Sequence, residues 1–120
     1  MQHVGVDIIE IGRIETVIKR WGRTFLERVF TPSELKRYNN TPSLAARFAA
    51  KEAVLKALGA CDKGISWQDI EILAEQNGKP QVNLTGKAKL EADAFAISKM
   101  NISISHSRDY AVAFVVGETE

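Results

Sequence analysis

The chain has very little cysteine, no long apolar run and almost no excess of charge of either sign. Its 120 residues include one cysteine, Cys61, which excludes an intramolecular disulfide and the zinc patterns that need several cysteines. No apolar run approaches the ~18 residues of a membrane span, and the N-terminus lacks a charged-then-apolar signal pattern. We therefore expect a cytoplasmic protein with a reduced thiol and no membrane partner.

The balance of charge is also informative. The formal net charge is +1, so general binding to nucleic acid is not expected. One stretch, residues 13–28, departs from this balance with a local charge of +3. Its charged residues are Arg13, Lys19, Arg20, Arg23 and Arg28 against Glu15 and Glu27. Such a stretch is either a solvated helix surface or the docking site of an acidic partner.

Length and composition predict a single domain over residues 1–120, long enough to bury a core. Hydrophobic periodicity predicts helices mainly in the first half and strands mainly in the second. The expected helices are Ile11–Gly22, a short one after the capping box Thr31-Pro32-Ser33-Glu34, Thr41–Gly59, and one from Thr85 to about Ile97. The expected strands are His3–Ile9, a hairpin of Asp69–Ala74 with the segment around Val82 and Leu84, Asn101–Ser107 and Tyr110–Val116. This pattern predicts an α+β fold with an antiparallel sheet and a long central helix.

The predicted long helix contains the segment RFAAKEAVLKALG, residues 47–59, which is apolar nearly all round. At ~100° per residue, Lys51 falls inside the arc of large apolar side chains and Glu52 lies at the edge of that arc. Such a helix is usually buried, and a buried charge must be paired or must bind a ligand. An ion pair between Glu52 and Lys56 is one explanation, and a ligand site is the other.

Asp7 is the one carboxylate in the middle of the predicted first strand, where it shares a face with Gly5. A role as a turn or capping residue would be structural. A second possibility is that Asp7 and Glu52 converge beside Lys51 and Lys56. Two carboxylates and two amines would form a small site for a hard cation and a phosphate.

Four segments of this sequence together resemble a known family. GVDIIEIGRI at residues 5–14 and RFAAKEAVLKALG at 47–59 are similar to the two signature segments of the phosphopantetheinyl transferases. The shortness of the chain, NGKP at 77–80 and SISHS at 103–107 resemble the short type that acts on acyl carrier protein. The resemblance covers essentially the whole chain and implies the phosphopantetheinyl transferase fold.

The resemblance also implies a function. It implies Mg²⁺-dependent transfer of 4′-phosphopantetheine from coenzyme A to a serine of acyl carrier protein, with adenosine 3′,5′-bisphosphate as the other product. Asp7 and Glu52 would hold the metal, and Lys56 would neutralise or protonate the leaving phosphate, so these three residues are the expected catalytic set. The serine proton would pass to a water on the metal or to Glu52, and both remain open. The expected coenzyme A-binding residues are Arg47, Lys51, Lys56, Gly59, Pro80, His106 and Ser107.

The remaining implications concern protein partners. A histidine that ends an alternating strand is usually structural, and only the SISHS resemblance assigns His106 and Ser107 to the nucleotide end of coenzyme A. By resemblance, Arg13, Arg20 and Arg23 on the first helix would dock the acidic carrier, and the chain would form a homotrimer with sites between subunits.

Two other functions compete with this one. A non-enzymatic module that binds coenzyme A or a nucleotide would not need both Asp7 and Glu52. A metal-dependent nuclease commonly needs more acidic ligands and a broader basic surface.

Overall fold

The computed structural model describes residues 1–59 and 64–119, so Cys61 lies outside the described residues. The strands are β1 (Gln2–Glu10), β2 (Ile70–Ala74), β3 (Pro80–Leu84), β4 (Ile97–His106) and β5 (Tyr110–Thr119). The α-helices are α1 (Ile11–Trp21), α2 (Arg23–Val29), α3 (Pro32–Arg37), α4 (Thr41–Ala57) and α5 (Gly86–Ala94), and the 3₁₀-helix η1 is Trp67–Asp69. The predicted α+β class is confirmed.

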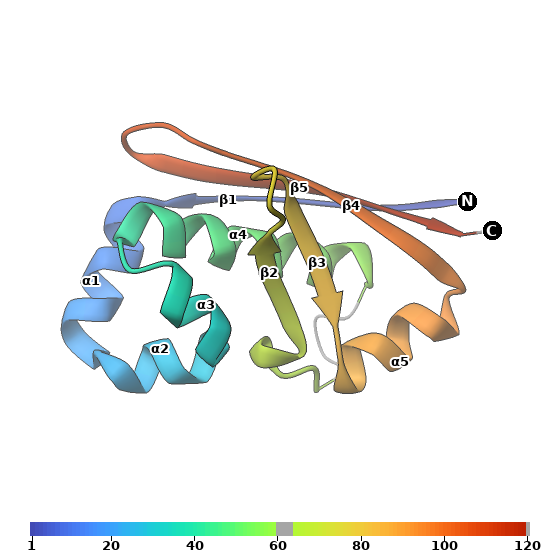
Figure 1. Cartoon of the computed structure of the whole chain (residues 1–120), viewed down its shortest axis with the longest axis horizontal. Coiled ribbons are helices and arrows are strands. Elements are labelled where there is room, and N and C mark those ends of the chain that lie inside the picture. The colour runs from blue at the N-terminus through green and yellow to red at the C-terminus, as the bar shows by residue number, and fades with distance from the viewer. Residues whose placement is uncertain (60–63, 120) are drawn as a thin grey trace.

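Two antiparallel sheets organise the chain. The larger has the strand order β1-β5-β4, and the smaller is the hairpin β2-β3. Helix α4 lies along one face of the larger sheet, with α1, α2 and α3 at one end and the hairpin and α5 towards the other (Figure 1). The central position of α4 was predicted, and it brings this helix against both β1 and β5.

Small side chains let α4 pack closely on its neighbours. Five of its alanines are fully buried, namely Ala45, Ala46, Ala49, Ala50 and Ala53. Alanine has a high helix propensity and little bulk, so the helix remains stable while adjacent backbones come near it. The N-terminus is capped by Asn40, whose side chain accepts a hydrogen bond from the Ser43 N–H at 2.9 Å.

The boundaries of some predicted elements are wrong, and the helices α2 and η1 were not predicted. Helix α5 ends at Ala94 and β4 begins at Ile97, because Ala96 adopts φ 57° and turns the chain there. Thr85 occupies the N-cap position of α5 but makes no capping hydrogen bond through its side chain. Helix α2 follows α1 directly after Gly22. The capping box at Thr31 is confirmed, with both of its hydrogen bonds formed.

The outer face of the larger sheet is apolar and exposed. Its most exposed large side chains are Ile8 at 63%, Val4 at 56%, Val6 at 51% and Phe114 at 47%. They lie on one face because Val6 pairs with Phe114 across β1 and β5, and side chains alternate along each strand. Among the described residues, every helix is too short or too polar to cross a membrane.

Candidate active site

Gly5 marks the place where β1 comes closest to α4. A Cβ atom at Gly5 would lie 2.8 Å from the backbone nitrogen of Ala57 and would overlap the carbonyl oxygen of Ala53. Only glycine leaves room for the helix backbone there. Asp7 follows two residues later and therefore faces the same side of the strand, towards α4. The spacing of Gly5 and Asp7 thus brings the first signature segment against the second.

We expect Gly5→Ala to destabilise the protein by roughly 1–3 kcal/mol, because the added methyl group forces β1 away from α4. Any activity that depends on Asp7 should fall as well, since Asp7 moves with the strand. Gly12→Ala is the matched control, because a Cβ at Gly12 meets no atom within 4 Å. Gly12 lies inside α1, so its replacement should be neutral or stabilising. Denaturant unfolding of both variants measures the difference, and equal stabilities would contradict the close approach.

The Asp7 carboxylate is bound by an amine from α4. Lys56 Nζ lies 3.1 Å from Asp7 Oδ1 and also donates a hydrogen bond to the Val6 carbonyl oxygen at 3.0 Å. The Lys56 side chain is about half exposed, at 49%. The ammonium group is therefore held at the rim of the site, where it can still reach a ligand. The structure thus pairs Lys56 with Asp7, a partner that neither sequence explanation named.

Glu52 lies one helical turn before Lys56 and lines a cavity of about 350 Å³ with Asp7 and Arg13. The other lining residues are Ile8, Ile9, Ile14, Val17, Phe25 and Phe48. Burial raises the pKa of Glu52, and the negative charge of Asp7 raises it further, while Lys56 opposes the rise. The two carboxylates are thus close enough to repel each other within a largely apolar cavity.

The chemistry of this pair fits a hard divalent cation. A cation between Asp7 and Glu52 would relieve their mutual repulsion. Magnesium typically uses one or two carboxylates and completes its octahedron with water and phosphate oxygens. No cluster of three or more His, Cys, Asp or Glu side chains suited to a metal occurs in residues 1–59 and 64–119. The available donors are therefore a pair of carboxylates, which suits Mg²⁺ better than a metal that needs a full set of protein ligands.

The prediction that Lys51 binds a phosphate of coenzyme A is wrong. Lys51 and Glu34 are both 0% exposed, and Lys51 Nζ lies 2.7 Å from Glu34 Oε1. The amine also donates to the Ile70 carbonyl at 2.6 Å and to the Trp67 carbonyl at 3.2 Å. Burial lowers the pKa of Lys51, and the charge of Glu34 opposes that shift. All three protons of the ammonium group have partners inside the protein, so none is available to a ligand.

The other residues assigned to coenzyme A do not line the Asp7–Glu52 cavity. Arg47 stacks on Tyr38, with its Cζ 3.7 Å from the ring centroid. Pro80 lines a separate hollow of about 450 Å³ formed by β3, β4 and β5. His106 and Ser107 are exposed at the end of β4, and Gly59, also exposed, follows α4 with φ 62°. One chain therefore presents these residues at several places on its surface.

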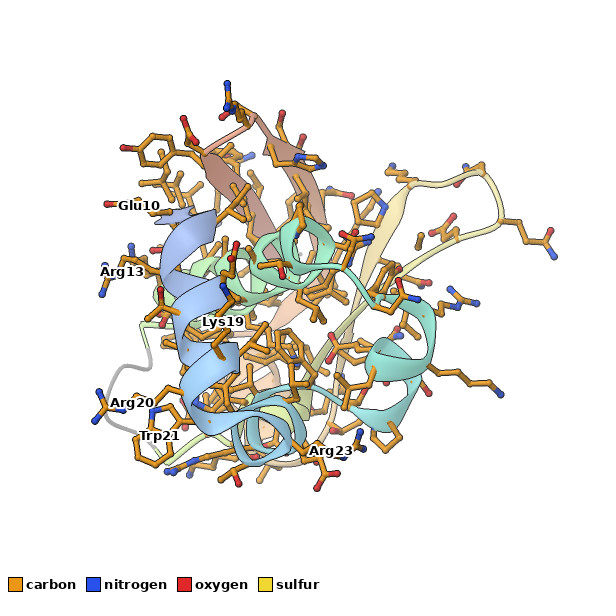
Figure 2. All side chains as sticks on the ribbon, turned by 90° about the vertical axis from the view of Figure 1, so that its left-hand side faces the viewer. Glu10, Arg13, Lys19, Arg20, Trp21 and Arg23 are labelled. Carbon is orange, nitrogen blue, oxygen red and sulfur yellow. The ribbon has the colours of Figure 1, made fainter. Side chains whose placement is uncertain are left out.

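The basic stretch forms an exposed surface on α1 and α2. Figure 2 shows Arg13 and Arg20 pointing to one side of α1, whereas Arg23 lies on the other side. Arg23 is the first residue of α2, so the assignment of all three arginines to the first helix is wrong. Its Nε also pairs with Glu27 Oε1 at 2.8 Å. Arg20 lies over the exposed ring of Trp21, with Cζ 5.4 Å from the ring centroid. Arg13 and Arg20 therefore share one exposed side of α1, and Arg23 lies outside that side.

Sequence reasoning missed two residues near this site. Glu34 was recognised only as part of a capping box, and nothing in the local pattern signals its ion pair with a lysine 17 residues later. Tyr38 was not singled out, although it contacts Arg47 and the hairpin. Both contacts join segments that are distant in the sequence, whereas hydrophobic periodicity gives information only about residues close in sequence.

A strand carrying Asp7 packs against a helix carrying Glu52 and Lys56, which gives this α+β fold a site with two carboxylates and one amine. Comparison with known families agrees, since residues 3–115 match the 4′-phosphopantetheinyl transferase superfamily, ACPS. The chain therefore belongs to the 4′-phosphopantetheinyl transferase superfamily.

Individual relatives cover nearly the whole chain. It is 50% identical over 119 residues to the holo-[acyl-carrier-protein] synthase of Dehalococcoides mccartyi, covering 98% of this chain and 99% of the relative. It is 52% identical over 118 residues to the enzyme of the same name from Protochlamydia amoebophila, covering 94% of each. The crystal structure of the Helicobacter pylori holo-[acyl-carrier-protein] synthase in complex with coenzyme A is similar with a TM-score of 0.87. The two sequences are 38% identical, and the similarity covers 96% of this chain and 99% of the Helicobacter pylori chain. The predicted phosphopantetheinyl transferase fold is confirmed.

Proposed function

We propose that this chain transfers 4′-phosphopantetheine from coenzyme A to a serine of apo acyl carrier protein. The observation that carries the proposal is that Asp7 and Glu52, from the two signature segments, line one cavity, while Lys56 Nζ lies 3.1 Å from Asp7 Oδ1. The 50% identity to a named synthase over almost the full chain supports it. In this reaction the serine oxygen bonds to the phosphorus that carries pantetheine. The diphosphate bond breaks, and adenosine 3′,5′-bisphosphate leaves.

The site residues divide this chemistry between them. Asp7 and Glu52 would hold Mg²⁺, which when bound neutralises charge on the diphosphate. Lys56 Nζ, held by Asp7 at the rim, can donate to an oxygen of the leaving phosphate, where negative charge develops. Phosphoryl transfer depends mostly on positioning and charge neutralisation. The carrier supplies the nucleophile, so this chain needs no catalytic serine or cysteine of its own.

The direct test is to incubate the chain with coenzyme A, Mg²⁺ and an apo acyl carrier protein and then to weigh the carrier. The carrier mass should increase by one phosphopantetheine group, and the increase should require both the metal and the acceptor serine. Binding of coenzyme A with no change in carrier mass would indicate a binding module instead. The absence of both coenzyme A binding and transfer would overturn the proposal.

We also propose that Arg13, with help from Arg20 and Arg23, docks the acidic carrier. Arg13 lines the Asp7–Glu52 cavity and lies on α1, so a protein bound there would present its serine to the site. Arg13→Glu should raise the KM for the carrier about tenfold or more, because it replaces an attraction with a repulsion. Affinity for coenzyme A measured without carrier should change little.

Saturation curves in carrier and in coenzyme A, at low and moderate salt, measure both effects. The carrier affinity of the unmodified protein should fall with added salt, since exposed charges are screened beyond ~8 Å at physiological ionic strength. Arg28→Glu is the control for a change of charge elsewhere on the basic stretch. Unchanged carrier kinetics in Arg13→Glu would return α1 to the role of a solvated surface.

The exposed sheet face and the scattered coenzyme A residues support a proposal about assembly. Val4, Val6, Ile8 and Phe114 form an apolar surface of a kind that monomers seldom expose. We propose a homotrimer that covers this face and completes each site with Arg47, Gly59, Pro80, His106 and Ser107 drawn from more than one subunit. Sedimentation analysis of the chain tests this, and a monomer at micromolar concentration would contradict it.

A further inference from the structure

Tyr38, directly after α3, contacts two separate segments that carry residues of the proposed coenzyme A site. Its ring lies against the guanidinium group of Arg47 on α4, with 3.7 Å between Cζ and the ring centroid. Its hydroxyl oxygen accepts a hydrogen bond from the Ala74 N–H at 2.9 Å. One side chain therefore connects the long helix with the last residue of β2.

The N–H and the carbonyl of Ala74 both form hydrogen bonds with the end of α3. Arg37 Nη1 donates to the Ala74 carbonyl at 2.8 Å, and Tyr38 accepts from the Ala74 N–H. Ala74 lies opposite Pro80 in the register of β2 and β3. Fixing Ala74 thus fixes Pro80, which belongs to the proposed coenzyme A site.

Arg47 has a hydrogen-bonding group that the protein does not satisfy. Its Nε is buried and has no hydrogen-bond partner within the described residues. A buried unpaired donor costs free energy, and an aromatic face orients a guanidinium without accepting its planar N–H bonds. A planar guanidinium that is held in place and short of acceptors suits an anionic oxygen ligand, and phosphate binds such a group through two parallel hydrogen bonds.

We propose that Tyr38 is a positioning residue for coenzyme A. It fixes the plane of the Arg47 guanidinium and the position of Pro80, so that both are in place before a phosphate of the nucleotide binds. This inference rests on the proposed function, because it takes coenzyme A as the ligand of Arg47. Tyr38 itself touches no reacting atom, so its effect falls on binding and leaves the chemical step unchanged.

The test compares Tyr38→Leu with Tyr38→Phe. The leucine variant loses both the stack and the hydroxyl acceptor, and its KM for coenzyme A should rise about tenfold, with kcat within about twofold of the original. The phenylalanine variant keeps the stack and should lose only about threefold in affinity. Titration calorimetry with coenzyme A checks the same ranking. If the leucine variant does not fold, the phenylalanine variant decides: a threefold loss supports the proposal, and no change overturns it.

Combining Tyr38→Leu with Arg47→Met separates positioning from general stability. In the Arg47→Met background the Tyr38 substitution should cost only the part due to the hairpin, about threefold, because there is no guanidinium left to orient. Independent, fully additive effects would overturn the proposal. Trp21→Leu is the matched control, since it removes the arginine–aromatic stack on α1, and coenzyme A affinity should stay unchanged. Failure of the proposed function would look different, because the unmodified chain would then bind no coenzyme A at all.

Discussion

Glu52→Gln should abolish most of the transfer while leaving the fold intact or slightly more stable. The amide has the same size as the carboxylate but loses the negative charge that Mg²⁺ needs, so we expect activity to fall at least about 100-fold. Stability should move the other way. The raised pKa of Glu52 means that its ionised form is disfavoured in the folded state. That penalty is absent below the unfolded-state pKa and complete above the folded-state pKa, so a neutral amide removes it at neutral pH.

Metal titration in the presence of coenzyme A, together with denaturant unfolding, checks both halves of this prediction. Asp93→Asn on α5 is the control, because it also neutralises an acid but at an exposed position paired with Lys89. That variant should keep full activity and metal affinity. Undiminished turnover in Glu52→Gln would remove Glu52 from the metal site, and a large loss of stability would show that its charge is structural.

Lys51→Met should destabilise the protein by about 3–5 kcal/mol, the largest stability effect expected of any change considered for this chain. The substitution leaves Glu34 as an uncompensated buried charge, because both side chains are 0% exposed. Glu34 keeps its hydrogen bonds from the Thr31 N–H and the Ile72 N–H, both at 2.8 Å, but loses its counter-ion. The effect should extend to the hairpin, since the Lys51 amine also binds the Ile70 carbonyl.

Adding Glu34→Gln to Lys51→Met should restore a large part of the lost stability, because no buried charge remains. Lys89→Met provides the matched control. Lys89 and Asp93 also form an ion pair, with 2.8 Å between Nζ and Oδ1, but both side chains are more than half exposed. Breaking it should cost at most about 1 kcal/mol. Equal costs for the two methionine substitutions, measured by urea unfolding, would contradict the structural role of Lys51.

The elements that the sequence predicted correctly are those whose signals are local. The capping box at Thr31, the alternation in β2 and β4 and the hairpin turn at Gln76-Asn77-Gly78 all depend on residues a few positions apart. Helix α2 was missed because it has seven residues, too few for a clear period, and follows Gly22 immediately. The start of β4 was misplaced because Ala96 turns the chain with φ 57°, and alanine gives no warning of a positive φ.

The same distinction applies to the site. The predicted convergence of Asp7 with Glu52 and Lys56 is present in the structure, as the shared cavity and the 3.1 Å contact of Asp7 with Lys56 show. The odd placement of Lys51 in an apolar arc correctly indicated a buried charge that needs a partner or a ligand, but periodicity could not identify which. The sequence prediction assigned a phosphate ligand to Lys51, whereas the structure pairs Lys51 with Glu34. Only tertiary structure distinguishes them.

The pairing of β1 with β5 has a consequence for the time at which the site appears during protein synthesis. Asp7 is opposite Ala113, and the backbone of Thr119 donates a hydrogen bond to the Met1 carbonyl at 3.1 Å, so the two ends of the chain lie side by side (Figure 1). A ribosome makes β1 first among the strands and β5 last. While the chain is still emerging, β1 has no neighbouring strand to hold it, and contacts between such distant segments form late. We therefore expect a nascent chain to hold Asp7 beside Glu52 and Lys56 only after β5 has been released from the ribosome.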